Sequence, residues 1–184
     1  GESSGSAGLD GVPRLAAGLA SGALPALTYL EIYDMHVGDA GASAIAAALD
    51  RGALPRLQTL SLANSVIGDA GLVALAPALG RLSALEELYL YGNPIGDEGV
   101  AALVAPPPPA GTPPRPAGGL KKLVLLDLDL TQVSDAGCAA LAAALDSGVL
   151  PALKDLRLVD ITASAAAKDA VSEALAKSRA AAPS

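Results

Sequence analysis

Residues 82–103 decide the fold, and they read LSALEELYLYGNPIGDEGVAAL. Leu88 and Leu90 alternate with Tyr89 and Tyr91, which is the two-residue period of a half-buried strand. A Gly-Asp-x-Gly turn follows at residues 96–99, and the chain then changes to apolar residues at helical spacing. We therefore expect one short strand and one helix within this unit.

The same pattern is repeated along the chain. Units start at Leu24, Leu54, Leu82, Leu120 and Leu150, which are 30, 28, 38 and 30 residues apart. The longer interval holds a proline-rich insertion, and the fifth unit has Ser164-Ala-Ala-Ala167 in place of the Gly-Asp-x-Gly turn. A unit of one strand and one helix cannot bury its apolar face alone, so the pattern predicts units stacked into a solenoid.

Polar residues mark where the predicted helices begin. The turn aspartates, Asp39, Asp69, Asp97 and Asp135, stand where an N-cap is wanted. An N-cap carboxylate accepts hydrogen bonds from the free N–H groups of the first helical turn. We expect each aspartate to cap the helix that follows it in its own unit.

The combined pattern, L-x-x-L-x-x-L-x-L followed by x-x-N-x-[IV]-G-D-x-G and a helix, resembles the leucine-rich repeat of the ribonuclease inhibitor type. The resemblance extends from about Gly8 to Leu175. It implies an α/β fold, a right-handed horseshoe arc with parallel strands on the concave face and helices on the convex face. The family's Asn occurs here only as Asn93, and we expect Ser65 and Thr131 to replace it in part in their own repeats.

The repeat boundaries divide the chain into segments. We expect a disordered N-terminal tail at residues 1–8 and a leucine-rich-repeat domain at residues 9–176. That domain comprises a half repeat, four full repeats and a degenerate last repeat, with the proline-rich insertion at residues 105–119. A C-terminal tail is expected at residues 177–184. Because the only Met is Met35, we expect a fragment, a processed product or a subunit of a larger assembly.

Composition excludes several classes of function. The chain is 52% hydrophobic but only 2% aromatic, with no Phe or Trp, so its core must consist of Leu, Ile, Val and Ala. One Cys and one His exclude a Cys/His structural zinc site and a disulfide framework, and we expect no metal and no cofactor. A net charge of −7 argues against nucleic acid as the main partner. The apolar runs are too short to span a membrane, and the single Cys138 favours a reducing, cytoplasmic location.

Strand alternation predicts one exposed face. If Leu30 and Ile32 point into the core, their strand neighbours point outward, and the same register holds in every repeat. All four tyrosines then lie on this face, among carboxylates and one arginine, and Tyr and Arg are common anchors of protein interfaces. The predicted partner-binding residues are Tyr29, Glu31, Tyr33, Thr59, Ser61, Glu87, Tyr89, Tyr91, Asp127, Asp129, Asp155 and Arg157.

Other candidate residues have simpler interpretations. The carboxylates Glu87, Asp127 and Asp129 could suggest a cation or an acid–base pair, but an open sheet face favours a solvated acidic surface. We expect His36 to be a structural or surface residue and Cys138 to be a packing or surface residue. The proline-rich insertion could present an extended ligand around Arg115, although such loops are more often tolerated surface insertions.

We therefore predict a non-enzymatic scaffold that binds a basic protein partner on this face, with no membrane partner. The family resemblance implies partners that range from nucleases and small GTPases to actin-associated proteins. Two alternatives remain open: a GTPase-activating accessory protein of the Ran-activator type, and a purely structural module of a larger assembly.

Overall fold

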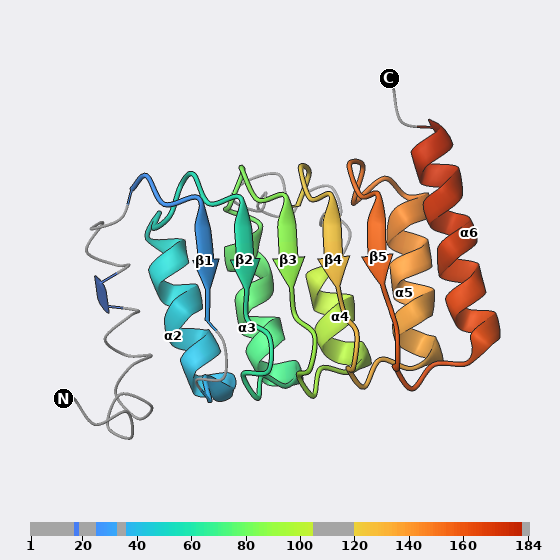
Figure 1. The fold of residues 1–184 in the computed structure, drawn as a ribbon, viewed down its shortest axis with the longest axis horizontal. Coiled ribbons are helices and arrows are strands. Elements are labelled where there is room, and N and C mark those ends of the chain that lie inside the picture. The colour runs from blue at the N-terminus through green and yellow to red at the C-terminus, as the bar shows by residue number, and fades with distance from the viewer. Residues whose placement is uncertain (1–16, 19–24, 33–35, 105–119, 182–184) are drawn as a thin grey trace, which may run out of the picture.

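The computed structural model describes residues 17–18, 25–32, 36–104 and 120–181. Five strands and five helices alternate along this part of the chain (Figure 1). The elements are β1 (Tyr29–Glu31), α2 (Gly38–Asp50), β2 (Thr59–Ser61), α3 (Asp69–Leu79), β3 (Glu87–Tyr89), α4 (Asp97–Leu103), β4 (Leu125–Asp127), α5 (Asp135–Asp146), β5 (Asp155–Arg157) and α6 (Ala165–Ala181). No helix in the described residues is long and apolar enough to cross a membrane.

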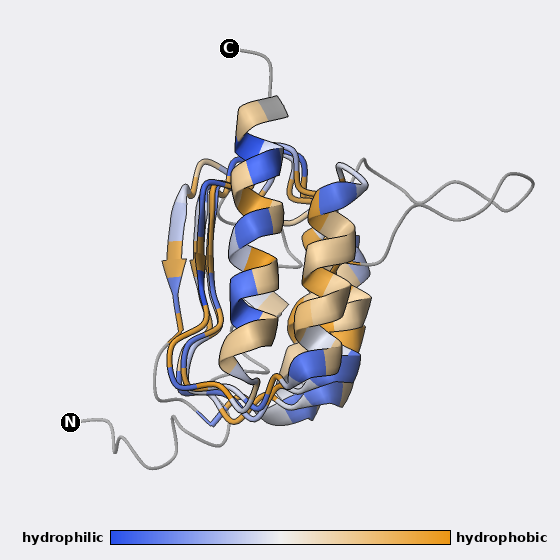
Figure 2. Ribbon diagram, turned by 90° about the vertical axis from the view of Figure 1, so that its right-hand side faces the viewer, coloured by the Kyte–Doolittle hydropathy of each residue, from blue (hydrophilic) through white to orange (hydrophobic). Residues whose placement is uncertain are grey.

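The strands form a single parallel sheet in the order β1-β2-β3-β4-β5. The helices form a second layer on one side of this sheet, as the turned view shows (Figure 2). Each element contacts its counterpart in the next repeat, and the predicted solenoid of stacked strand–helix units is confirmed.

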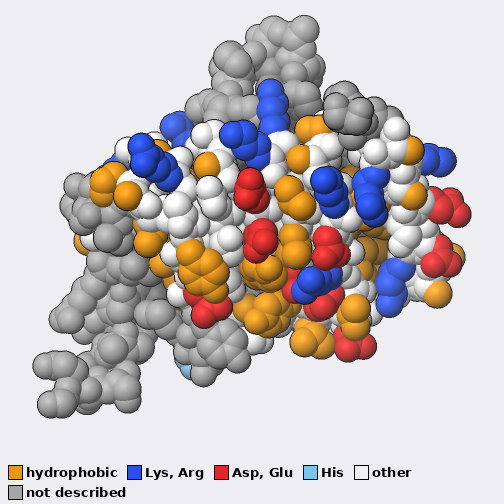
Figure 3. All heavy atoms as spheres, turned by 45° about the horizontal axis from the view of Figure 1, so that its top comes forward, with side chains coloured by type: hydrophobic (Ala, Val, Ile, Leu, Met, Phe, Trp, Pro, Cys, Tyr) orange, Lys and Arg blue, Asp and Glu red, His pale blue; other side chains and the backbone are white. Residues whose placement is uncertain are grey.

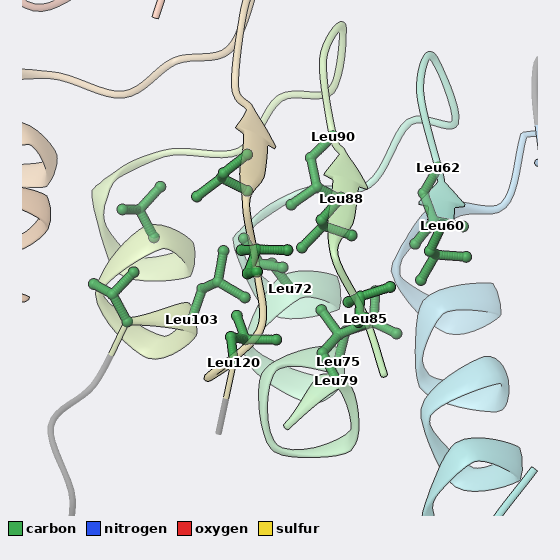
Figure 4. Packing of buried hydrophobic residues seen from close by; sticks show 14 of the residues in the cluster. Leu60, Leu62, Leu72, Leu75, Leu79, Leu85, Leu88, Leu90, Leu103 and Leu120 are labelled. Atoms are coloured by element: carbon green, nitrogen blue, oxygen red, sulfur yellow. The ribbon is translucent and has the colours of Figure 1, made fainter. Parts of the chain in front are cut away.

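The core lies between the two layers and is built mainly from leucines (Figure 4). The central residue of each strand pairs with its equivalent across the sheet, and Leu60, Leu88 and Leu126 are completely or almost completely buried. Leu30 and Leu156 lie in the two edge strands of the described sheet and are only half buried, because each edge strand pairs with one described strand only. A core of this kind has no need of Phe or Trp.

The turn aspartates do not act as predicted. The residues that begin α3, α4 and α5 form no side-chain cap, and each aspartate instead binds the start of the helix in the following repeat. Asp69 Oδ1 accepts hydrogen bonds from Gly96 N (2.8 Å) and Gly99 N (2.9 Å) at the start of α4. Equivalent bonds join Asp39 to Gly68 and Gly71, and Asp97 to Ser134 and Gly137. The prediction of caps within each repeat was wrong, because the carboxylate caps the next helix and thereby joins two repeats.

This shared cap explains the second glycine of the turn. A Cβ atom on Gly137 would lie 2.5 Å from Asp97 Oδ1 and 2.7 Å from a methyl group of Val133. In the last repeat this glycine is replaced by Ala167, whose N–H donates to Ser164 Oγ and not to the preceding aspartate. Asp135 binds only Ser164, through its N–H at 2.7 Å and its hydroxyl at 3.1 Å. In the degenerate last repeat, the aspartate therefore keeps the main-chain bond to the first turn residue and lacks the bond to the fourth.

Asn93 connects two repeats in the turn after β3. Its side-chain oxygen accepts from Ser65 N (2.9 Å) and Ile67 N (3.1 Å), and its amide donates to Leu62 O (2.8 Å) and Leu90 O (3.0 Å). The expected partial replacement is confirmed. Ser65 Oγ donates to Ile32 O and Ala63 O, and Thr131 Oγ1 donates to Leu128 O.

Two predicted boundaries differ from the structure or lie outside it. The C-terminal tail expected from residue 177 was wrong for its first part, because α6 continues to Ala181. Helix α4 ends at Leu103 after 7 residues, directly before the proline-rich insertion. That insertion, the N-terminal tail and nearly all of the half repeat lie outside the described residues.

Candidate binding face on the sheet

The outward side chains of the five strands gather around a shallow hollow of about 450 Å³, which we call the strand face. All the predicted site residues line this hollow except Tyr33 and Asp155. Tyr33 lies outside the described residues, and Asp155 is exposed beside Arg157 at the β5 end. The structure thus brings the other ten together, and their role in binding stays a prediction.

Two tyrosines on this face are each paired with a glutamate of their own strand. Tyr29 Oη donates to Glu31 Oε2 at 3.2 Å, and Tyr89 Oη donates to Glu87 Oε2 at 3.0 Å. Each pair is two residues apart on one strand, so both side chains point to the same side of the sheet. Partial burial, followed by the bond to Glu87, raises the pKa of the Tyr89 hydroxyl above its ordinary value. These bonds hold the phenol rings in place while leaving Tyr29 55% exposed.

Asp127 is buried on this face, with only 4% of its surface exposed. It accepts a hydrogen bond from Asp129 N at 3.0 Å, and its other oxygen lies 3.8 Å from Arg157 Nη1. Burial is the main cause that raises the pKa of the Asp127 carboxyl. The expectation of a fully solvated acidic face was therefore wrong at Asp127, because its flanking strands cover it.

The strand face carries a net negative charge. Arg157 also lies 3.4 Å from Asp155, so the only cation on the described part of this face is shared between two carboxylates. Glu31, Glu87 and Asp129 form no ion pair within the described residues. Figure 3 shows acidic and hydrophobic side chains intermixed on this side of the molecule.

Leu130 also lines the hollow, and sequence alternation did not predict it. Counting in twos from Leu126 and Leu128 assigns Leu130 to the core, yet it is 56% exposed. The reason is a left-handed backbone with φ of 57°, which turns the side chain outward. The same position has the same left-handed backbone in three other repeats, at Asn64, Gly92 and Asp160. The alignment of the repeats, and not strand alternation, was therefore the sequence feature that could have predicted an exposed Leu130.

The remaining candidates do not form a second site. His36 is exposed in the turn after β1, and Cys138 is 1% exposed in the core, where burial raises the pKa of its thiol. In the part of the chain that the structure describes, no three His, Cys, Asp or Glu side chains are placed to hold a metal ion.

Comparison with known proteins agrees with the repeat geometry. A family model described as a leucine-rich repeat matches residues 54–76, 83–104 and 119–142. These matched segments and the stacked strand–helix units support a leucine-rich-repeat solenoid as the fold. The ribonuclease-inhibitor type remains a prediction, and none of the curated protein sequences matches the chain.

Two solved structures are similar to this leucine-rich-repeat fold as a whole. The tropomodulin C-terminal domain of Caenorhabditis elegans is 20% identical, with a TM-score of 0.64, and the match covers 92% of this chain and 93% of that one. The structure titled Leiomodin-1 Actin-Binding Site 2 is 15% identical, also with a TM-score of 0.64, covering 91% and 88%. At these identities the likeness concerns the fold.

Proposed function

We propose that this protein is a non-enzymatic interaction module whose strand face binds a basic segment of a protein partner. The single observation that carries the proposal is the exposed Leu130 beside tyrosines that the sheet holds in place. The leucine-rich-repeat fold supports it, because this architecture presents an extended surface from successive repeats. The similar structure of Leiomodin-1 is titled an actin-binding site, so actin is the first individual protein to test as a partner.

Leu130 occupies its position at a cost in stability. A left-handed backbone costs about 1–2 kcal/mol for a residue with a Cβ, whereas Asn, Asp and Gly adopt it readily. The equivalent residues Asn64, Gly92 and Asp160 belong to this permissive group, and Leu130 does not. A strained residue that exposes a large apolar side chain on a candidate surface supports a role in binding.

The charges favour a basic partner. Glu31, Glu87 and Asp129 present carboxylates around the apolar groups without a paired cation among the described residues. Such a field attracts Lys and Arg side chains and excludes acidic competitors. Tyr29 and Tyr91 then offer rigid amphipathic rings for contact with the stems of those side chains or with apolar neighbours.

The test pans a random library of twelve-residue peptides against the full chain and measures the enriched basic peptides by fluorescence anisotropy. Tyr91→Ala should weaken their binding about tenfold, as expected for an interface anchor. Leu130→Asn should also weaken binding, yet raise the free energy of unfolding by about 1 kcal/mol because it relieves the left-handed leucine. The same variants are then tested against purified actin.

The matched control is Val73→Ala, which removes a 39% exposed apolar side chain from α3 in the helical layer. Binding of basic peptides should be unchanged in this variant. The proposal fails if no basic peptide is enriched, or if Val73→Ala weakens binding as much as Tyr91→Ala does.

A further inference from the structure

A second charged surface lies at the edge of the solenoid where helices end and strands begin. The described connections at this edge, residues 51–58, 80–86, 120–124 and 147–154, contain six Lys or Arg and one carboxylate, that of Glu86. The described connections at the opposite edge contain no Lys or Arg. Figure 3 shows most Lys and Arg side chains in the upper half of the view, with most acidic side chains below them. The described loops at this edge are therefore basic, although the net charge of the whole chain is −7.

Helix dipoles do not account for this row of cations. A cation stabilises the negative end of a helix when it lies within the last turn. Helices α2, α3, α4 and α5 have no basic residue in their last turn, and α2 and α5 end in Asp50 and Asp146. The loop cations lie beyond these helix ends, where Arg81 pairs with Asp50 at 3.1 Å, whereas Arg179 lies in the last turn of α6.

One end of this edge is hollowed into a groove of about 780 Å³, between the loops before β4 and β5 and the last turns of α6. We call it the edge groove. Its accessible apolar lining includes Val124, Pro151 and Ala176, whereas Leu153 belongs to the core with 1% of its surface exposed. Lys121, Lys154 and Arg179 also line the groove, and all three are exposed. None of the three forms an ion pair or a side-chain hydrogen bond with another described residue.

We propose that the edge groove docks an acidic peptide segment of a partner protein, with an apolar side chain of that segment against Val124 and Ala176. Three cations without ion-pair partners among the described residues provide the charge complementarity. The mixture of apolar and cationic lining residues fits a peptide that carries both carboxylates and an apolar side chain. This surface is separate from the strand face and has the opposite charge, so it does not depend on the function proposed above.

The same library panning tests this proposal with different peptides and different variants. Acidic peptides that contain apolar residues should be enriched, and their affinity should fall at least tenfold in the double variant K154E/R179E. The double variant R56E/K122E is the matched control, because it changes net charge equally and alters exposed cations of the same edge outside the groove. Acidic peptides should lose less than threefold in affinity for this control.

Several results would overturn the proposal. These are the absence of enriched acidic peptides, an equal loss in the two double variants, and groove-dependent binding of a single-stranded RNA or of anionic lipid vesicles in place of peptides. Tyr91→Ala should leave the binding of acidic peptides unchanged, since it lies on the strand face. A failure of the edge groove is thereby distinguishable from a failure of the strand face.

Discussion

The change Asn93→Ala should be among the most destabilising substitutions in this protein. Asn93 is 2% exposed, and its side chain forms four hydrogen bonds of 2.8 to 3.1 Å to main-chain groups of two repeats. A fifth contact, to Tyr91 O at 3.5 Å, is weak. Alanine cannot form any of these bonds, so four main-chain groups lose a partner at a position that is 2% exposed.

The size of the effect follows from the number of bonds. Each buried main-chain group that loses its partner costs about 1 kcal/mol or more, so four groups predict a loss of about 4 kcal/mol. That is a large part of the roughly 5–15 kcal/mol typical of a domain. Ser65→Ala is the matched control at the equivalent position of the previous repeat. Ser65 Oγ forms two longer bonds, of 3.1 and 3.4 Å, and its removal should cost only about 1 kcal/mol.

Denaturant unfolding followed by far-ultraviolet circular dichroism measures both variants, because the chain has no Trp for a fluorescence signal. A loss below about 2 kcal/mol in Asn93→Ala, or a loss no larger than in Ser65→Ala, would refute the reasoning. The turn would then hold its shape without the asparagine.

Three further predictions concern two aspartates and a turn glycine. Hydrogen bonds, first that of the Ser134 hydroxyl, lower the pKa of the Asp97 carboxyl. The ionised carboxylate therefore stabilises the fold at pH values above the ordinary pKa of Asp, and this stabilisation is lost as the pH falls through the lowered pKa. Asp97→Asn should cost stability at pH 7 and progressively less towards pH 2. Burial raises the pKa of Asp127, so the opposite sign holds: Asp127→Asn should gain stability relative to the parent chain as pH rises from 3 to 7. A profile with the wrong slope in either variant would contradict the assignment for that aspartate. Gly99→Ala places a Cβ 2.9 Å from Asp69 Oδ1 and should lower the free energy of unfolding by about 2 kcal/mol, whereas Ala101→Gly on the exposed face of the same helix should cost no more than about 1 kcal/mol.

The repeat pattern predicted the fold well because it is local and repeated. The two-residue period and the Gly-Asp-x-Gly turn recur in register, so the alignment of repeats alone pairs Leu60, Leu88 and Leu126 as the sheet does. The same alternation predicted the strand-face residues, and ten of the twelve line one hollow. Errors arose where a contact crosses between repeats or where the backbone leaves the strand.

Particular residues show this limit. Asp69 is at the start of α3, yet its carboxylate accepts hydrogen bonds from Gly96 and Gly99 in the next repeat. Asp127 reads as a solvated strand residue, yet it is buried among the neighbouring strands. Leu130 reads as a core residue, but its left-handed backbone exposes it.

The sequence by itself determined the repeat, the alternation of strand and helix, the leucine core and the face that carries the tyrosines. Each of these depends on the period of apolar residues, which is a property of neighbours along the chain. Only the tertiary structure decided which helix an aspartate caps, that Leu130 joins the strand face, and that Lys121, Lys154 and Arg179 meet around one groove. These features depend on distances between atoms of different repeats, and periodicity within one repeat carries no information about such distances.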